Sequence, residues 1–410
     1  MATSSAASDL ATRMHELVRS GVDMGKDRLK PTSSPFWAGL VKAGTQCWLD
    51  TGDIAAAEKS WTSEFSGLTT NNTLLNKEVQ TGVYDTFIPE VAKLVATLDK
   101  KEEILEIAFA LNARHGLRLV SRFGSWVSVE LHTDLANDLE RSLAYGIRYH
   151  AICPERFIVK VPMTPSGLIA ARKLGERGIP VNLTLGFSAR HNFLTTAVAK
   201  PRYCNVFLGR LGAYISDFKL GDAKMVGEKA LWASQNTIRQ MNGGKTLQIA
   251  ASLREPSQLE TLAGCDVITM PTPVAEGGVK TLKGVWSDHA KTPLSVSVPN
   301  PEKLRLNTLW DISDNEKKLI ESLTAKQPES GAELLERIRS GGCADLFPKL
   351  SSEDQAAIIK DGKIPKHERW AARIASGEVA IDTLLNLAAL GSFTTDQAAL
   401  DARIQKNMGA

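Results

Sequence analysis

One lysine stands inside an otherwise uncharged, apolar stretch of the chain. Lys160 is the fourth residue of Phe157–Pro162, which reads FIVKVP. A lysine in such a run either extends from an edge strand to solvent or carries its amine into an apolar site. Desolvation lowers the pKa of an amine and makes it a nucleophile towards a carbonyl carbon. The pattern therefore makes Lys160 a candidate for forming a Schiff base.

Schiff-base chemistry also needs a group that moves protons at the carbon where a bond breaks or forms. Asp50 and Glu130 each stand at the end of a short apolar run and are the candidates. Asp53 is the better N-cap for the helix after the first run, which leaves Asp50 free for chemistry. Glu130 has a structural alternative, since an ion pair with Lys160 would hold the lysine charged.

Two arginines near the ends of later runs indicate an anion site. Arg210 follows Gly209, and Ser252 and Arg254 stand two residues apart at the end of the next run. A phosphate site needs fixed cations and backbone donors, and arginine suits it because its donors can bind two phosphate oxygens. The alternative for each arginine is an ion pair at the protein surface.

These residues belong to a chain in which short apolar runs alternate with helical stretches. Such alternation favours a parallel sheet. Eight units in about 230 residues predict that the sheet closes into a (β/α)8 barrel, whose strand ends meet at the active-site mouth. A doubly wound open sheet is the alternative, although no G-x-G-x-x-G motif follows the first run. The predicted strands are Thr45–Asp50, Ser66–Asn71, Trp126–Leu131, Phe157–Pro162, Val181–Leu185, Tyr203–Gly209, Thr246–Ser252 and Val267–Pro271.

The pattern divides the chain into three parts. Residues 1–44 form a helical N-terminal segment with an amphipathic helix at Leu10–Val22, residues 45–275 the barrel, and residues 276–410 a helical C-terminal extension. Residues 272–301 read as a loop because they contain four prolines. Thr394 and Gln397 have the spacing of a capping box. The predicted C-terminal helices are Asp314–Ala325, Gly331–Ser340, Ser352–Asp361, Glu378–Leu390 and Thr395–Asn407.

Composition narrows the functional classes. The 410 residues carry 49 Lys and Arg against 46 Asp and Glu, a balance that does not predict nucleic-acid binding. No apolar run is long enough to cross a membrane. The five cysteines are far apart and include no C-x-x-C, so we expect neither a disulfide framework nor a metal site. A cytoplasmic location is favoured, and the Ser- and Ala-rich N-terminus leaves import into an organelle open.

Seven segments that contain these residues together resemble the transaldolase family. Their order and spacing match from about Thr45 to Met270. The segments are Asp50–Asp53, Thr69–Asn71, Val129–Glu130, Lys160–Pro162, Val181–Ser188, Val206–Arg210 and Ala251–Arg254.

The resemblance implies a class I enzyme without metal or cofactor, which binds sugar phosphates. Lys160 would form the Schiff base with a ketose phosphate, Asp50 would be the acid and base of C–C cleavage, and Glu130 and Thr184 would hold a water. The dihydroxyacetone unit would pass to an aldose phosphate, as in the non-oxidative pentose phosphate pathway. A homodimer is a further expectation. The implied substrate-binding residues are Asn71, Asn182, Asn205, Phe207, Arg210, Ser252 and Arg254.

The chain also departs from the family pattern. Asn72 replaces a proline of the family's Thr-Asn-Pro, and Asn205 stands where the family has serine. Phe207 resembles the residue that transaldolases carry at this position, whereas the related fructose-6-phosphate aldolases carry tyrosine there. Two alternatives follow. The chain is an aldolase that releases free dihydroxyacetone, or a non-catalytic barrel that binds a partner through its C-terminal helices.

Overall fold

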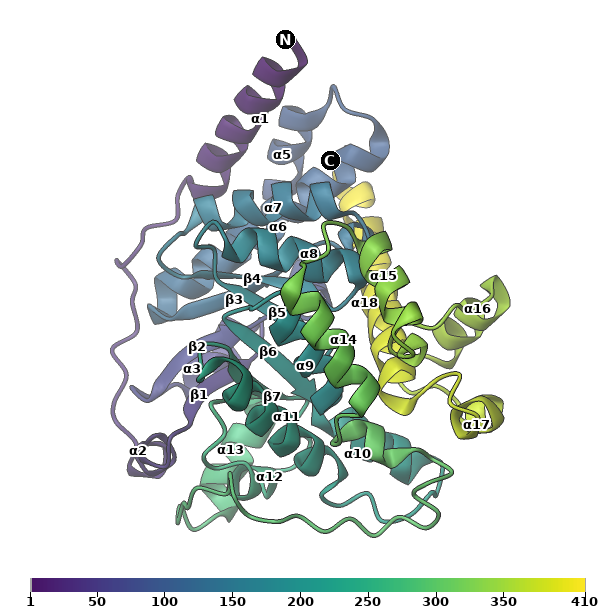
Figure 1. Ribbon diagram of the computed structural model, residues 1–410. Helices are drawn as coiled ribbons and strands as arrows, with labels where there is room; N and C mark the ends of the chain where they lie inside the picture. The colour runs from purple at the N-terminus through teal and green to yellow at the C-terminus, as the bar shows by residue number, and fades with distance from the viewer. Residues whose placement is uncertain (1, 410) are drawn as a thin grey trace.

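The computed structural model describes residues 2–409, and a closed barrel of eight parallel strands forms its centre (Figure 1). Each strand pairs with the next one in the sequence, and β8 pairs with β1. The (β/α)8 barrel prediction is confirmed, and the open-sheet alternative is wrong. The strands are β1 (Gln46–Asp50), β2 (Phe65–Thr69), β3 (Trp126–Glu130), β4 (Phe157–Pro162), β5 (Val181–Thr184), β6 (Tyr203–Phe207), β7 (Leu247–Ala251) and β8 (Val267–Met270).

Large aromatic side chains fill the barrel at the beginning of its strands. The buried Trp48 of β1 packs edge-on against Tyr203 of β6, with ring centroids 5.0 Å apart. Gly67 of β2 makes room for the indole, because a Cβ there would lie 2.5 Å from a ring atom of Trp48. The side chains of Asp50, Thr69 and Lys160 lie nearer the C-terminal ends of their strands, which is where barrel enzymes hold their active sites.

Helices surround the barrel, and several begin at side-chain caps. Asp53, Asp138, Thr164 and Ser188 each accept a hydrogen bond from a backbone N–H in the first turn of the helix that follows. The barrel helices are α3 (Ile54–Ser60), α4 (Asn72–Gln80), α5 (Phe87–Val95), α6 (Lys100–Phe123), α7 (Leu139–Ile152), α8 (Pro165–Gly175), α9 (Ala189–Val198), α10 (Leu208–Asp217), α11 (Val226–Asn242), α12 (Gln258–Thr261) and α13 (Thr272–Thr281).

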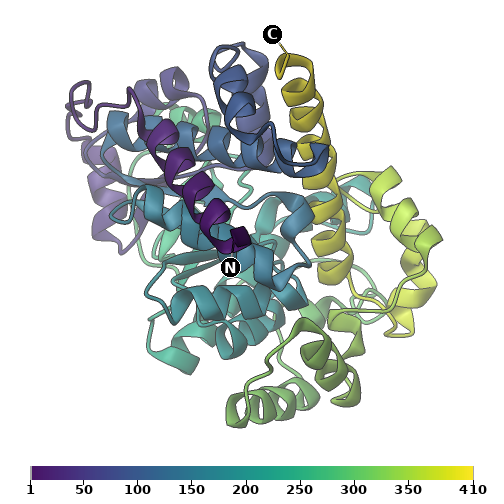
Figure 2. The same ribbon diagram turned by 90° about the horizontal axis from the view of Figure 1, so that it is seen from above.

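The N-terminal segment packs on the outside of the barrel. Helix α1 (Ala2–Arg19) lies across α6 and α7, as the view from above shows (Figure 2). The predicted apolar face is present, because Met14 and Val18 are fully buried. A second helix, α2 (Pro35–Lys42), which the sequence analysis did not predict, places Trp37 against Phe65 of β2.

The C-terminal part differs from the prediction in three places. Residues 272–281 form helix α13 instead of a loop, because Pro273 lies in the first turn, where its missing N–H costs nothing. The last two predicted helices are one, α18, and the hydroxyl of Thr394 bonds back to the Leu390 carbonyl inside it, so the capping-box interpretation is wrong. Helix α17 was not predicted. The helices are α14 (Asp314–Ala325), α15 (Gly331–Ser340), α16 (Ser352–Asp361), α17 (His367–Ala375) and α18 (Ile381–Asn407).

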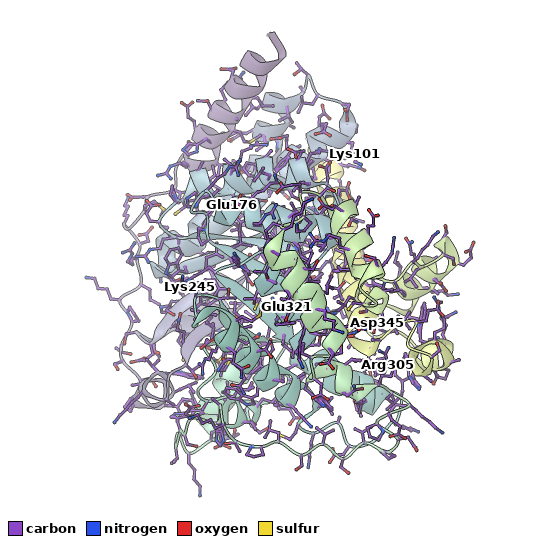
Figure 3. The ribbon with its side chains drawn as sticks, in the orientation of Figure 1. Lys101, Glu176, Lys245, Arg305, Glu321 and Asp345 are labelled. Atoms are coloured by element: carbon purple, nitrogen blue, oxygen red, sulfur yellow. The ribbon has the colours of Figure 1, made fainter. Side chains whose placement is uncertain are left out.

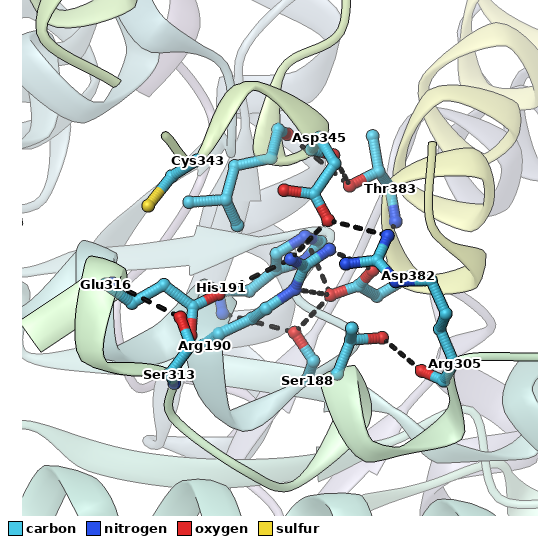
Figure 4. A network of polar contacts seen from close by, with 12 residues as sticks. Ser188, Arg190, His191, Arg305, Ser313, Glu316, Cys343, Asp345, Asp382 and Thr383 are labelled. Atoms are coloured by element: carbon cyan, nitrogen blue, oxygen red, sulfur yellow. Dashed lines mark hydrogen bonds and ion pairs between the residues drawn. The ribbon is translucent and has the colours of Figure 1, made fainter. Parts of the chain in front are cut away.

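A buried cation fastens this part to the barrel (Figure 4). Arg190, at the start of α9, binds both oxygens of Asp382 of α18 at 2.8 Å. Its third nitrogen contacts Asp345 at 2.8 Å and Glu316 at 3.4 Å. Arg305, which lies beside Asp345 in Figure 3, adds a second cation at 3.2 Å. Three separate segments of the C-terminal part therefore converge on one arginine.

The charges of this cluster depend on one another. Burial alone would raise the pKa of Asp382, yet Arg190 and the hydroxyl of Ser188 lower it well below its usual value. Burial likewise opposes the charge of Arg190, but the surrounding carboxylates raise the pKa of its guanidinium. His191, also buried, lies 3.4 Å from Asp382, and its pKa falls to about 4, mainly through burial. The cluster is stable as ion pairs and would be costly with any partner missing.

Replacing Arg190 with methionine tests this attachment. The substitution leaves three carboxylates in a buried site, so we expect the free energy of unfolding to fall by about 3–5 kcal/mol. Urea denaturation measures the change. Lys317→Ala is the control, because its ion pair with Asp314 is exposed and removing it should change stability by less than about 1 kcal/mol. Equal stability of the two variants would contradict this account.

Candidate active site

A cavity of about 470 Å³ opens at the C-terminal ends of the strands. Nine of the eleven predicted site residues line it: Asp50, Asn71, Lys160, Asn182, Asn205, Phe207, Arg210, Ser252 and Arg254. Glu130 and Thr184 do not line it but contact residues that do. The closed barrel thus brings residues from six strands or strand-ends into one place.

Lys160 lies in the wall of this cavity and is 4% exposed. Its ammonium donates to the carbonyl of Thr70 at 3.0 Å and lies 3.7 Å from a carboxylate oxygen of Glu130. In the sheet register Lys160 pairs with Glu130 of β3 and Asn182 of β5, so these three side chains share one layer of the barrel. The lysine is therefore an inward group, and the edge-strand interpretation is wrong.

Asp50 faces the same cavity from β1. The hydroxyl of Thr69 donates to its carboxylate at 2.8 Å, and this hydroxyl also contacts Thr269 at 2.7 Å. Burial raises the pKa of Asp50, although Lys160, Thr69 and Lys77 act against the shift. A carboxyl group with a raised pKa is suited to both taking and returning a proton.

Glu130 lies behind Lys160, and Asn72 holds its carboxylate. The backbone N–H of Asn72 donates to Glu130 at 3.1 Å, while the Asn72 side chain donates to the carbonyl of Leu131 at 3.3 Å. A proline at this position has no N–H to give. Burial raises the pKa of Glu130, and Lys160 and the Asn72 N–H act against that shift. The departure from the family pattern at Asn72 thus adds a hydrogen bond to this carboxylate.

Asparagine side chains connect the remaining polar groups. Asn205 donates to the Thr184 hydroxyl at 3.0 Å and accepts from the Gly186 N–H at 3.3 Å, so both ends of its amide are used. Asn182 donates to Ser128 at 3.1 Å, and its carbonyl oxygen has no hydrogen-bond partner within residues 2–409. Asn71 caps α4 through its carbonyl oxygen, which leaves its amide N–H groups for the cavity.

The other side of the cavity carries cations. Arg210 is 7% exposed, and its Nη1 lacks a hydrogen-bond partner in the part of the chain that the structure describes. Burial and the neighbouring Arg254 lower the pKa of Arg210 to about 10. Gly209 allows this arrangement, because a Cβ there would lie 2.0 Å from the carbonyl oxygen of Ser252. A buried guanidinium with a free donor beside a second arginine is typical of an anion site.

Helix α18 covers the cavity with a residue that the sequence analysis did not select. The ring of Phe393 lies 5.7 Å from the Lys160 ammonium and 6.0 Å from the Arg210 guanidinium. Asn386, two turns earlier, donates to the carbonyls of Met163 and Leu185, just after the strands that carry Lys160 and Thr184. No local signal marks Phe393, since an apolar residue in a helix usually belongs to the core.

Residues 2–409 contain no group of three or more His, Cys, Asp or Glu side chains placed to hold a metal ion. All five cysteines are free and buried. No described helix is both long enough and apolar enough to cross a membrane.

The family model for transaldolase and fructose-6-phosphate aldolase matches residues 47–326. The chain belongs to this transaldolase family. A transaldolase of Xanthomonas oryzae pv. oryzae is 28% identical over 293 residues, which cover 68% of this chain and 86% of that protein. A probable transaldolase of Thermus thermophilus is 32% identical over 230 residues, or 55% of this chain and 86% of that one.

A solved structure, the carboxyl transferase domain of Rhizobium etli pyruvate carboxylase, aligns with 98% of this chain and 89% of its own at 11% identity, but the TM-score of 0.33 is too low for comparing folds. The family match ends at residue 326, before the C-terminal helices that follow α14. Residues 327–410 lie outside the matched range, and they include α18 with Phe393. The residues that cover this cavity thus come from a part of the chain beyond the family model.

Asn72→Pro tests whether the backbone donor tunes Glu130. Position 72 is the first residue of α4, where proline is well tolerated, so the fold should be retained. Loss of the N–H removes a bond to the ionised carboxylate, and we expect the pKa of Glu130 to rise in a carboxyl-carbon NMR titration. Asn72→Ala keeps the N–H and should leave that pKa near the wild-type value. The same rise in both variants would assign the effect to the side chain instead.

Asp50→Asn tests the cost of the buried carboxylate. Because the pKa of Asp50 is raised in the folded protein, its ionised form opposes folding once the pH exceeds its ordinary value of 3.8. The variant should therefore gain about 0.5–2 kcal/mol at pH 7, and the gain should shrink as the pH falls towards that value. Urea denaturation at several pH values measures it. Asp53→Asn is the matched control, because asparagine caps a helix equally well.

Proposed function

We propose that this protein is a transaldolase, which transfers a dihydroxyacetone unit from a ketose phosphate to an aldose phosphate through a Schiff base on Lys160. The observation that carries the proposal is the buried amine of Lys160 in a cavity that also holds Asp50 and an unsatisfied arginine. An amine, a proton carrier and an anion site are the three parts that the reaction needs. Family membership supports the same reaction class.

The first half-reaction forms an imine and breaks a carbon–carbon bond. The neutral amine of Lys160 attacks the ketose carbonyl carbon to give a carbinolamine. The carbinolamine hydroxyl leaves as water with the proton that Glu130 took up from the lysine, and a protonated imine remains. Asp50 then removes the proton of a hydroxyl group of the substrate. This hydroxyl is on the carbon that becomes the aldehyde of the leaving aldose phosphate. The carbon–carbon bond breaks, and the aldose phosphate departs. The electron pair of the broken bond moves into the protonated imine to form a neutral enamine on Lys160.

The second half-reaction reverses these steps with a new aldehyde. The enamine carbon attacks the acceptor, the acceptor oxygen takes the proton back from Asp50, and water hydrolyses the imine. The enamine must survive between the two halves, so water must not protonate it. Phe393, only 6% exposed and close to Lys160, is placed to keep water away from that carbon.

Glu130 and Thr184 have the supporting roles in imine formation and hydrolysis. Glu130 lies 3.7 Å from the Lys160 nitrogen and has a raised pKa, so it can take up a proton when the amine becomes neutral. Thr184 accepts a hydrogen bond from Asn205, which leaves its own proton for a water beside the imine. Asn71 and Asn182 are proposed to bind substrate hydroxyls, and Arg210, Ser252 and Arg254 to bind the phosphate.

The residue type at one position of the cavity favours the transfer reaction over simple aldol cleavage. Phe207 of β6 lines the cavity and has no hydroxyl that could donate a proton to the enamine. We place the reaction in the non-oxidative pentose phosphate pathway, in the cytoplasm. Supplying fructose 6-phosphate with and without erythrose 4-phosphate separates the two activities, since an aldolase releases free dihydroxyacetone without an acceptor.

Borohydride trapping tests the Schiff base. Reduction in the presence of fructose 6-phosphate should attach a three-carbon adduct to Lys160, located by peptide mass spectrometry. Lys160→Met should give no adduct and should lose transfer activity by at least about a thousandfold, since nucleophile removal eliminates the covalent route. Lys229→Met, at a half-buried lysine that packs on Trp310, is the control and should be trapped normally. An adduct that persists in Lys160→Met would refute the assignment.

A further inference from the structure

The α16–α17 turn brings one more cation to the catalytic cavity. Lys363 lies between α16 and α17, the helices that stand out at the right of Figure 1, and it lines the same cavity as Arg210 and Arg254. The family match ends at residue 326, so this turn is not part of the matched range. A role for Lys363 in substrate specificity rests on the proposed transaldolase function.

The turn is held in place from both sides. The buried carboxylate of Asp361 accepts the backbone N–H of Lys366 at 3.0 Å and pairs with Arg369 at 3.5 Å. Gly362 has a φ of +79°, a backbone conformation that favours glycine. These contacts bridge the five-residue turn. Its shape is thus defined by short-range bonds before any ligand arrives.

A second contact ties the turn to the helix that carries Arg210. His367, four residues after Lys363, contacts the hydroxyl of Tyr214 at 2.9 Å, and the two rings meet edge-on at 5.8 Å. Tyr214 is one helical turn after Arg210 on α10, so the two side chains share a face of that helix. This contact fixes the start of α17, directly after the turn that carries Lys363, against the helix that carries Arg210.

The ammonium of Lys363 is not committed to another protein group. Its side chain is exposed, and it makes no ion pair or hydrogen bond with any residue that the structure describes. Asp361, the acidic residue nearest to Lys363 in the sequence, already accepts a hydrogen bond from the Lys366 N–H and pairs with Arg369. The acidic residue that acts on Arg210 is Asp396, and its carboxylate accepts a hydrogen bond from the hydroxyl of Thr73. Positive charge thus exceeds negative charge around the Arg210 donor.

We propose that Lys363 is a specificity-determining residue that binds the phosphate of the sugar substrate together with Arg210 and Arg254. A phosphate ester carries a charge of about −1.5 to −2 at pH 7 and has three strong acceptor oxygens. It can therefore accept hydrogen bonds from a lysine as well as from two arginines. The third cation favours phosphorylated over unphosphorylated sugars. Because it comes from the α16–α17 turn, substrate selection depends on the C-terminal part as well as on the barrel.

The test compares Lys363→Ala with Lys366→Ala, an exposed lysine of the same turn that does not line the cavity. We expect Lys363→Ala to raise the KM for fructose 6-phosphate about three- to tenfold, the range of a charge-assisted contact at a solvent-exposed site, with kcat changed less than twofold. Trapping with unphosphorylated dihydroxyacetone should be unaffected. Lys363→Arg should restore the KM, and Lys366→Ala should match the wild type.

Binding of inorganic phosphate, measured by calorimetry, separates this inference from the catalytic proposal. Weaker phosphate binding in Lys363→Ala supports the cation site even if the wild-type protein shows no transfer. Equal phosphate affinity and equal KM in Lys363→Ala and the wild type would overturn the role of Lys363 while leaving the transaldolase proposal intact. A KM that rises equally for phosphorylated and unphosphorylated substrates would also overturn it, because the effect would then be structural.

Discussion

The ion-pair cluster around Arg190 is the constraint on which the functional arrangement depends. Its guanidinium is 2% exposed, and removing such a charge from water is favourable only with well-placed carboxylates around it. Asp382, Asp345 and Glu316 meet this need, and each comes from a different part of the C-terminal region. One buried cation at the start of α9 thus fixes where α18 begins. From there the helix runs over the cavity and places Phe393 beside Lys160.

The barrel strands and the C-terminal helices contribute different residues to the site. The strands supply the reactive groups in layers, with Glu130, Lys160 and Asn182 in one register. The C-terminal helices supply the ceiling, through Asn386, Phe393 and the turn that carries Lys363. Burial raises the pKa of both Asp50 and Glu130, so this enclosure also prepares the carboxyl groups for proton transfer. The reactive residues and the residues that cover them thus come from different regions of the chain and meet only in the folded protein.

Local sequence signals predicted the strands well and the C-terminal helices less well. Each strand is a short run of apolar residues that the closed sheet buries on both faces, so its pattern survives in the sequence alone. The single helix α18 was split in two because Gly391, Ser392, Thr394 and Thr395 resemble a helix end. In the structure the hydroxyls of Thr394 and Thr395 bond back to carbonyls one turn earlier, and packing on α4 and α16 keeps the helix intact. Tertiary contacts thus outweighed local preference.

The barrel and the side chains at its strand ends could be predicted from local features of the chain. A lysine in an apolar strand, acids at two strand ends and arginines after later strands are features of single segments. Three features could not be predicted in this way. The backbone N–H of Asn72 donates to Glu130, Asn205 donates to the Thr184 hydroxyl, and Phe393 and Lys363 line the cavity. Alternation and charge placement are local, whereas a contact such as that between Lys160 and Phe393 joins residues more than 200 positions apart and leaves no periodic trace in either segment.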